Sequence, residues 1–91
     1  MSDDAILSAV LDALLDCMAF LELSDEESVN TDDAVRTLET VGWRLQQLSP
    51  HDQSALTTMI VARAKIEANP QRRRFTEATP DALGLLDAGD D

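Results

Sequence analysis

The sequence predicts an all-α fold: a small bundle of three main helices followed by a short C-terminal helical turn. Hydrophobic residues make up 44% of the 91 residues, whereas aromatic residues make up only 3%. Ala, Leu and Val must therefore supply the core, which suits helix-on-helix packing better than a sheet rich in aromatic and β-branched side chains. The chain has only three Gly and three Pro, too few for the frequent tight turns of an all-β protein. This length corresponds to one domain.

The first helix is expected over residues 3–23, with Ser2 as its N-cap, and apolar side chains cover much of its circumference. They form two adjacent stripes: Leu7, Leu11, Leu14, Met18 and Leu21 in one, and Ile6, Val10, Cys17 and Phe20 in the other. A one-sided amphipathic helix has a stripe about 100° wide, whereas these two together cover roughly 200°. Two flanking helices could cover this surface, or one flanking helix and a second copy of the chain. We expect a homodimer formed through this helix.

The second helix is expected over residues 32–48. Its apolar residues recur at four- and three-residue steps from Ala34 to Leu48, which is a heptad-like pattern. Thr31 is the predicted N-cap. Just before it, Ser24 and Glu27 have the spacing of a capping box.

The third helix is expected over residues 50–68 and completes a bundle within residues 1–70. Ser49 followed by Pro50 predicts an N-cap and a first helical residue. Pro70 is expected to end this helix, because proline cannot continue the hydrogen-bond ladder. Residues 71–91 then form an acidic-ended tail, in which Thr79 and Pro80 open one short helical turn.

Negative charge is concentrated in the first third of the chain. The formal net charge is −11, and residues 1–33 contain ten acidic residues but no Lys, Arg or His. Such a field repels nucleic acid and anionic membranes and attracts basic surfaces. Solubility and the stabilisation of helix starts are the competing explanation. The predicted partner-binding carboxylates are Asp12, Asp16, Glu22, Asp25, Glu26, Glu27, Asp32 and Asp33.

Trp43 is the ninth predicted partner-binding residue. It lies roughly 160° around the second helix from Leu45, outside the apolar stripe. A tryptophan in this position is either covered by another element or available to a partner as an anchor. Apolar residues of the tail, Phe75, Leu83 and Leu86, are the expected cover.

Catalysis and metal binding are not expected. Cys17, expected to be buried among its apolar neighbours, has no charged base near it in the sequence, and His51 stands alone in a helix start. Gly-rich phosphate loops and nucleophile elbows are absent from the sequence. The stretch "SDEESVNTDD" lacks the spacing and the central Gly of an EF-hand loop. We therefore expect no enzyme activity, no metal and no cofactor.

The N-terminus is acidic where a signal peptide would be basic, and no apolar run approaches the thickness of a bilayer. A cytoplasmic protein with no membrane contact is expected. One basic triplet, residues 72–74, stands against a strongly acidic background, so specific nucleic-acid binding is not expected either.

In size, acidity and helical layout the chain resembles the small all-α immunity proteins that neutralise bacterial toxins, including some paired with type VI secretion effectors. The resemblance implies a non-catalytic immunity protein or antitoxin, an inhibitor that masks a basic surface of a toxin or effector. One alternative is a homodimeric scaffold or regulatory subunit with no toxin partner. Another is an acyl or peptidyl carrier, with Ser54 as the nearest candidate for the modified serine, although Gln53 and Ala55 flank it where carriers have Asp and Leu.

Overall fold

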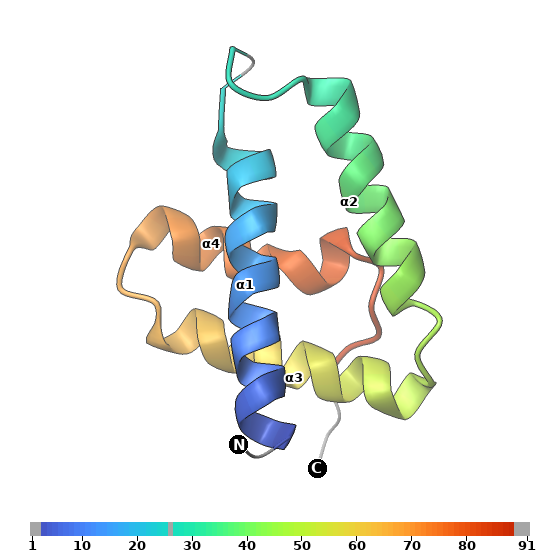
Figure 1. The fold of residues 1–91 in the computed structure, drawn as a ribbon. Helices are drawn as coiled ribbons and strands as arrows, with labels where there is room; N and C mark the ends of the chain where they lie inside the picture. Colours follow the sequence, from blue (N-terminus) through green and yellow to red (C-terminus); the bar gives the residue numbers. More distant parts are fainter. Residues whose placement is uncertain (1–2, 26, 89–91) are drawn as a thin grey trace. The chain divides into compact units, whose positions relative to one another are not determined.

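The computed structural model describes residues 3–25 and 27–88, and over these residues it contains four helices and no strand (Figure 1). The helices are α1 (Asp3–Leu23), α2 (Thr31–Leu45), α3 (Pro50–Ile66) and α4 (Pro70–Ala82). The all-α prediction is confirmed. The chain forms two compact units, residues 1–34 and residues 35–91.

Helix α1 dominates the first unit and has the predicted bounds. Leu11, Leu15, Met18 and Ala19 are buried along it. Leu11, Leu15 and Met18 follow one another at steps of four and three residues, and Ala19 lies four residues after Leu15, so all of them share one face of the helix. The carboxylates of Asp3 and Asp4 lie in the first turn, where they favour the positive end of the helix dipole. The predicted cap, Ser2, lies outside the described residues.

Two side chains other than those predicted organise the segment between α1 and α2. Asp25 Oδ1 accepts a hydrogen bond from the backbone N–H of Ser28 at 3.0 Å, and the chain turns there instead of starting a helix at Ser24. Asn30 Oδ1 accepts from the N–H of Asp33 at 3.0 Å, which makes Asn30 the N-cap of α2. The predicted cap, Thr31, is instead the first residue of α2, and α2 ends at Leu45, three residues earlier than predicted.

In the second unit, α3 begins as predicted and ends two residues early. Ser49 Oγ accepts from the N–H of Asp52 at 3.1 Å, and Pro50 occupies the first helical position. At the other end, Arg73 Nε donates to the carbonyl oxygen of Glu67 at 2.9 Å. This contact satisfies a carbonyl that the end of α3 leaves without a helical partner.

The prediction of a tail with one helical turn is wrong, because residues 70–82 form α4. Asn69 Oδ1 accepts from the N–H of Arg72 at 2.9 Å, and Pro70 is the first helical residue. Pro70 therefore starts a helix as well as ending one. Thr79, the predicted cap, lies inside α4, where its Oγ1 donates to the carbonyl oxygen of Phe75 at 2.8 Å. Pro80 follows it within the helix.

A Schellman motif ends α4. The N–H of Gly84 donates to the carbonyl oxygen of Asp81 at 3.1 Å, and the N–H of Leu85 donates to that of Pro80 at 3.0 Å. Gly84 has φ of 71°, a left-handed conformation that glycine adopts without the steric cost of a Cβ.

Helices α3 and α4 pack together as an antiparallel pair, and the segment after α4 returns toward α3 (Figure 1). The apolar core of this unit is small: Ile60, Ala64, Leu83 and Leu85. Four polar side chains are buried with it, namely Gln53, Thr57, Thr76 and Thr79. Every buried side-chain nitrogen and oxygen among the described residues has a hydrogen-bond partner, so this core does not incur the cost of unpaired polar groups.

Over the described part of the chain, no helix combines the length and the apolar character that crossing a bilayer requires.

Candidate binding surfaces

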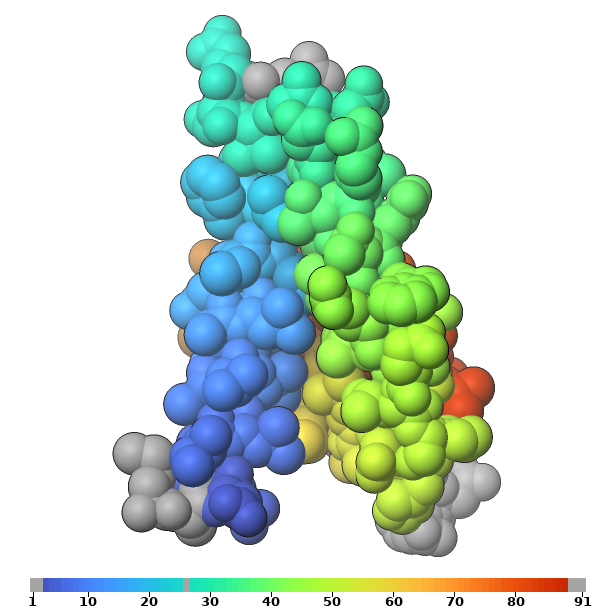
Figure 2. Space-filling model, turned by 45° about the vertical axis from the view of Figure 1, so that its right-hand side comes forward, coloured from blue at the N-terminus to red at the C-terminus, as the bar shows by residue number. Residues whose placement is uncertain are grey.

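The first candidate surface is the acidic segment, residues 22–33, which joins the end of α1 to the start of α2. Its described carboxylates are all exposed: Glu22, Asp25, Glu27, Asp32 and Asp33. In the space-filling view, the side chains of this segment (teal) stand at the surface beyond α1 (blue) (Figure 2). Glu26, also predicted to bind a partner, lies outside the described residues.

Local turn chemistry explains why these carboxylates are gathered here. Asp25 closes a turn through its side chain, and Asp32 and Asp33 occupy the first turn of α2, where negative charge is stabilised by the helix dipole. Asp25 can fulfil its turn role as Asn would, because only an acceptor oxygen is needed. The negative charge of Asp25 is therefore not required by the local fold.

Asp12 and Asp16 are exposed on the body of α1. Asp16 and Glu22 are about 9 Å apart along the helix axis and about 120° apart around it, so the predicted carboxylates do not form one uniform face. Asp12, Asp16 and Asp33 each already have an interaction partner within the chain. The anionic surface is therefore centred on Glu22, Asp25, Glu27 and Asp32.

The second candidate surface is an apolar seam on α1. Ile6, Val10 and Phe20 are 48%, 58% and 58% exposed, and Ala13 and Cys17 between them are exposed as well. The five positions follow each other at steps of four, three, four and three residues, which places them on one helix face. Cys17 was expected to be buried, and this prediction is wrong. Including Ala13 in the pattern would have revealed the continuous seam in the sequence.

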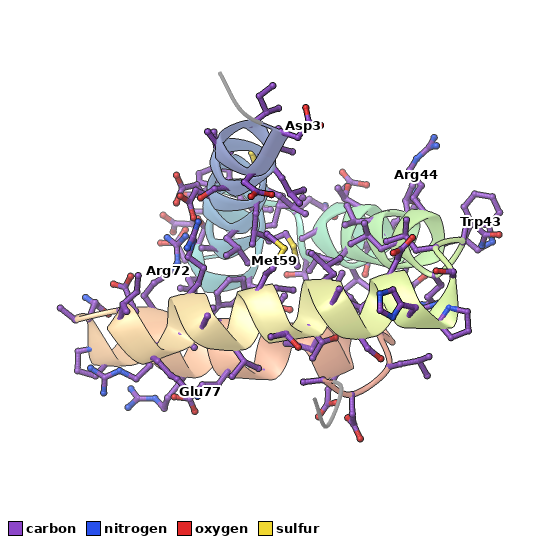
Figure 3. All side chains as sticks on the ribbon, turned by 90° about the horizontal axis from the view of Figure 1, so that it is seen from below. Asp3, Trp43, Arg44, Met59, Arg72 and Glu77 are labelled. Carbon is purple, nitrogen blue, oxygen red and sulfur yellow. The ribbon has the colours of Figure 1, made fainter. Side chains whose placement is uncertain are left out.

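The third candidate surface is Trp43 on α2. It is 61% exposed, and its indole projects outward from the helix (Figure 3). Of the expected covers, Leu83 is buried elsewhere in the core of the second unit and Leu86 is itself half exposed, so the prediction that the tail covers Trp43 is wrong. The exposed indole matches the other interpretation, that of an anchor for a partner.

The described residues hold no group of three His, Cys, Asp or Glu side chains able to bind a metal ion. His51 is exposed in the first turn of α3, and Ser54, one turn further on, is half-buried. Neither residue belongs to a cluster of catalytic groups that the structure describes.

No protein-family model matches the chain, and no curated protein or solved structure matches it either.

Proposed function

We propose that this protein is a non-catalytic binding protein whose acidic segment docks on a basic surface of a partner protein. The observation that carries the proposal is the exposure of Glu22, Asp25, Glu27 and Asp32 within a 33-residue region that contains no basic residue. Exposed carboxylates that outnumber the basic residues of their segment produce a negative potential that extends about one Debye length into solution. Such a potential accelerates encounter with a basic partner and disfavours acidic ones.

Trp43 supports the proposal as a second contact point. Tryptophan is enriched among the few interface residues that contribute most to affinity, because burying its large ring removes much apolar surface from water. An exposed Trp43 has that surface available. The acidic segment would then raise the rate of association and select the partner, and Trp43 would contribute to the affinity.

A toxin or effector with a basic functional surface is the partner class that we propose. If that surface binds nucleic acid, the carboxylates of the acidic segment would occupy positions that phosphates otherwise take. The protein would then act as an immunity protein or antitoxin by masking the surface. Co-expression with the protein encoded by the adjacent gene tests this narrower form: the neighbour should harm cells alone and copurify with this protein. A neighbour that does neither contradicts the toxin-neutralising role.

Two variants of equal charge test the role of the acidic segment. The first carries Glu22→Gln, Asp25→Asn, Glu27→Gln and Asp32→Asn. The control carries Glu39→Gln, Asp52→Asn, Glu77→Gln and Asp81→Asn, which are exposed carboxylates of the second unit. Each variant changes the formal charge from −11 to −7, and Asp25→Asn keeps the acceptor that Ser28 uses.

Affinity for the copurifying partner is then measured by calorimetry at about 0.1 M and about 1 M salt, between which the Debye length falls from about 10 Å to about 3 Å. At low salt, we expect the first variant to bind at least about tenfold more weakly than the natural protein. We expect high salt to weaken binding of the natural protein by at least about the same factor. The control variant should retain most of the affinity. Equal losses in the two variants would show that overall charge, and not the acidic segment, governs binding.

The alternative function, a homodimeric scaffold, is favoured by one specific observation, the exposed apolar seam on α1. A dimer formed through that seam would resist salt, because apolar contacts are not screened. Light scattering over a range of protein concentrations decides between a monomer and a dimer, and repetition at high salt identifies the kind of contact.

A further inference from the structure

The apolar seam of α1 (Ile6, Val10, Ala13, Cys17 and Phe20) has the geometry of one half of a helix–helix interface. Its 4–3–4–3 spacing is the repeat that lets side chains of two helices interlock. From Ile6 to Phe20 the seam is about 21 Å long at 1.5 Å per residue, the length of two heptads. Exposed apolar side chains scattered singly are ordinary, but a row of this length and regularity marks an interaction surface.

The seam lies roughly opposite the face that α1 buries. Leu11, Leu15 and Met18 are at most 3% exposed, and their mean direction is about 145° around the helix from that of the seam. The buried residues of α1 therefore share one face, and the seam is a second, separate apolar face.

The charges on α1 indicate what kind of helix fits the seam. All five charged residues of α1 are acidic: Asp3, Asp4, Asp12, Asp16 and Glu22. Asp3 lies on one border of the seam, and Asp16, which also has an interaction partner within the chain, lies on the other. In paired helices, charges at the borders of the apolar seam select the partner.

We propose that the seam binds an amphipathic helix of the partner, with apolar residues at heptad spacing and Lys or Arg at its borders. This inference rests on the proposed function and names the element of the basic partner that this chain recognises. The apolar row supplies affinity, and the basic borders meet the acidic ones.

A second copy of the chain is a poorer occupant, for an electrostatic reason. Two α1 helices packed in parallel or antiparallel orientation would bring together only negative charges, because α1 has no basic residue in either case. Like charges across a helix pair destabilise it. A basic helix removes this repulsion and replaces it with attraction.

Three synthetic peptides of 21 residues test the proposal. The first is helical, with Leu at the heptad seam positions and Lys at the borders. The second replaces the Lys with Glu, and the third keeps the Lys but replaces each seam Leu with Ser. Binding to the full chain is measured by fluorescence anisotropy of labelled peptide. We expect the first peptide to bind at least tenfold more tightly than either of the others.

Substitutions of exposed residues locate the binding site without threatening the fold. Val10→Ser with Phe20→Ser removes the two most exposed large residues of the seam. Val35→Ser with Ile66→Ser is the matched control, since these residues are 49% and 75% exposed outside α1. We expect the seam variant to lose at least tenfold in affinity for the first peptide and the control to lose less than twofold. Circular dichroism confirms that both variants remain helical.

Cys17 provides an independent measurement, because its exposed thiol lies within the seam. Saturation with the first peptide should slow the reaction of Cys17 with a thiol reagent at least tenfold. Unchanged reactivity in the bound state would place the peptide elsewhere and overturn the proposal.

The remaining outcomes separate this inference from the proposed function. Equal binding of the first and third peptides would mean that charge alone acts, which overturns the seam proposal and leaves the role of the acidic segment intact. Equal binding of the first and second would overturn the choice of a basic helix. A concentration-dependent dimer in which Cys17 is protected would assign the seam to a second copy. Absence of binding to all three would overturn the inference, while the co-expression experiment would still decide the proposed function.

Discussion

Gln46 Nε2 donates a hydrogen bond of 2.7 Å to the carbonyl oxygen of Leu83, 37 residues further along the chain. Gly42 lies one turn earlier on α2, and a Cβ built on it would stand 2.9 Å from the same oxygen. Leu83 itself is 2% exposed. The segment after α4 is therefore held against the backbone of α2, and it is an integral part of the second unit.

Replacing Gly42 by Ala should destabilise the protein. In an exposed helix the same change would stabilise it by about 1 kcal/mol, since Ala is the better helix former. Here the new methyl group would collide with backbone atoms of Leu83, which cannot move aside as a flexible side chain could. We expect the free energy of unfolding to fall by about 1–3 kcal/mol, the usual cost of overpacking, as measured by urea denaturation.

Glu39→Ala is the control for Gly42→Ala, because Glu39 is exposed on the same helix. It should change the free energy of unfolding by less than about 0.5 kcal/mol. A Gly42→Ala variant more stable than the natural protein would show that α2 and the C-terminal segment do not approach each other this closely.

Gly84→Ala should also destabilise the protein, for two separable reasons. The left-handed conformation at φ 71° costs a non-glycine residue about 1–2 kcal/mol, and the new Cβ would stand 2.6 Å from Gln46 Nε2. A double-mutant cycle with Gln46→Ala isolates the second effect, because that substitution removes the amide. We expect Gly84→Ala to cost less in the Gln46→Ala background. An identical cost in both backgrounds would contradict the contact between the two residues.

Gln53 holds the turn between α2 and α3 against the C-terminal segment. Its Nε2 donates to the carbonyl oxygens of Gln46 and Leu48, each at 3.0 Å, and its Oε1 accepts from the N–H of Leu86 at 3.4 Å. Gln53→Leu keeps the volume but removes all three bonds. An unpaired buried polar group costs about 1–3 kcal/mol, so we expect a loss of at least about 2 kcal/mol in the free energy of unfolding.

Gln71→Leu makes the same chemical change at an exposed position of α4 and should have little effect on stability. Similar unfolding curves for Gln53→Leu and the natural protein would mean that water replaces the lost bonds, and that the Gln53 contacts do not hold the second unit together.

The sequence predicted some of the helix ends that local chemistry determines and missed others. Helix α1 has its predicted bounds, and α3 starts at the predicted Ser49 cap. The Asn69–Pro70 pair uses the same capping chemistry as Ser49–Pro50, yet Pro70 predicted only the end of α3. Thr79 and Pro80 were interpreted as the start of a separate short turn, whereas both lie inside α4 and the hydroxyl of Thr79 bonds within that helix. Helix α4 was therefore missed despite a readable start signal.

Exposure could not be predicted in the same way, because it depends on which elements pack together. Cys17 was expected to be buried among its apolar neighbours, and Trp43 was expected to be covered by apolar residues of the tail. Both side chains are exposed. The tail residue Leu83 instead packs in the core of the second unit, held by Gln46. Hydrophobic periodicity identifies the faces of a helix, but tertiary packing decides which face is covered.

Trp43 should report on its own exposure, because it is the only tryptophan in the chain. At 61% exposure, its fluorescence should have the red-shifted maximum of a solvated indole, and the neutral quencher acrylamide should reduce it nearly as efficiently as that of free tryptophan. Trp43→Ala should change the free energy of unfolding by less than about 0.5 kcal/mol, as for other surface substitutions, yet weaken binding to a protein partner by about 2 kcal/mol or more if Trp43 is an anchor. A blue-shifted, poorly quenched emission would mean that the indole is covered. A large loss of stability in Trp43→Ala would assign it to the core, because only buried aromatic side chains cost about 3–5 kcal/mol when truncated.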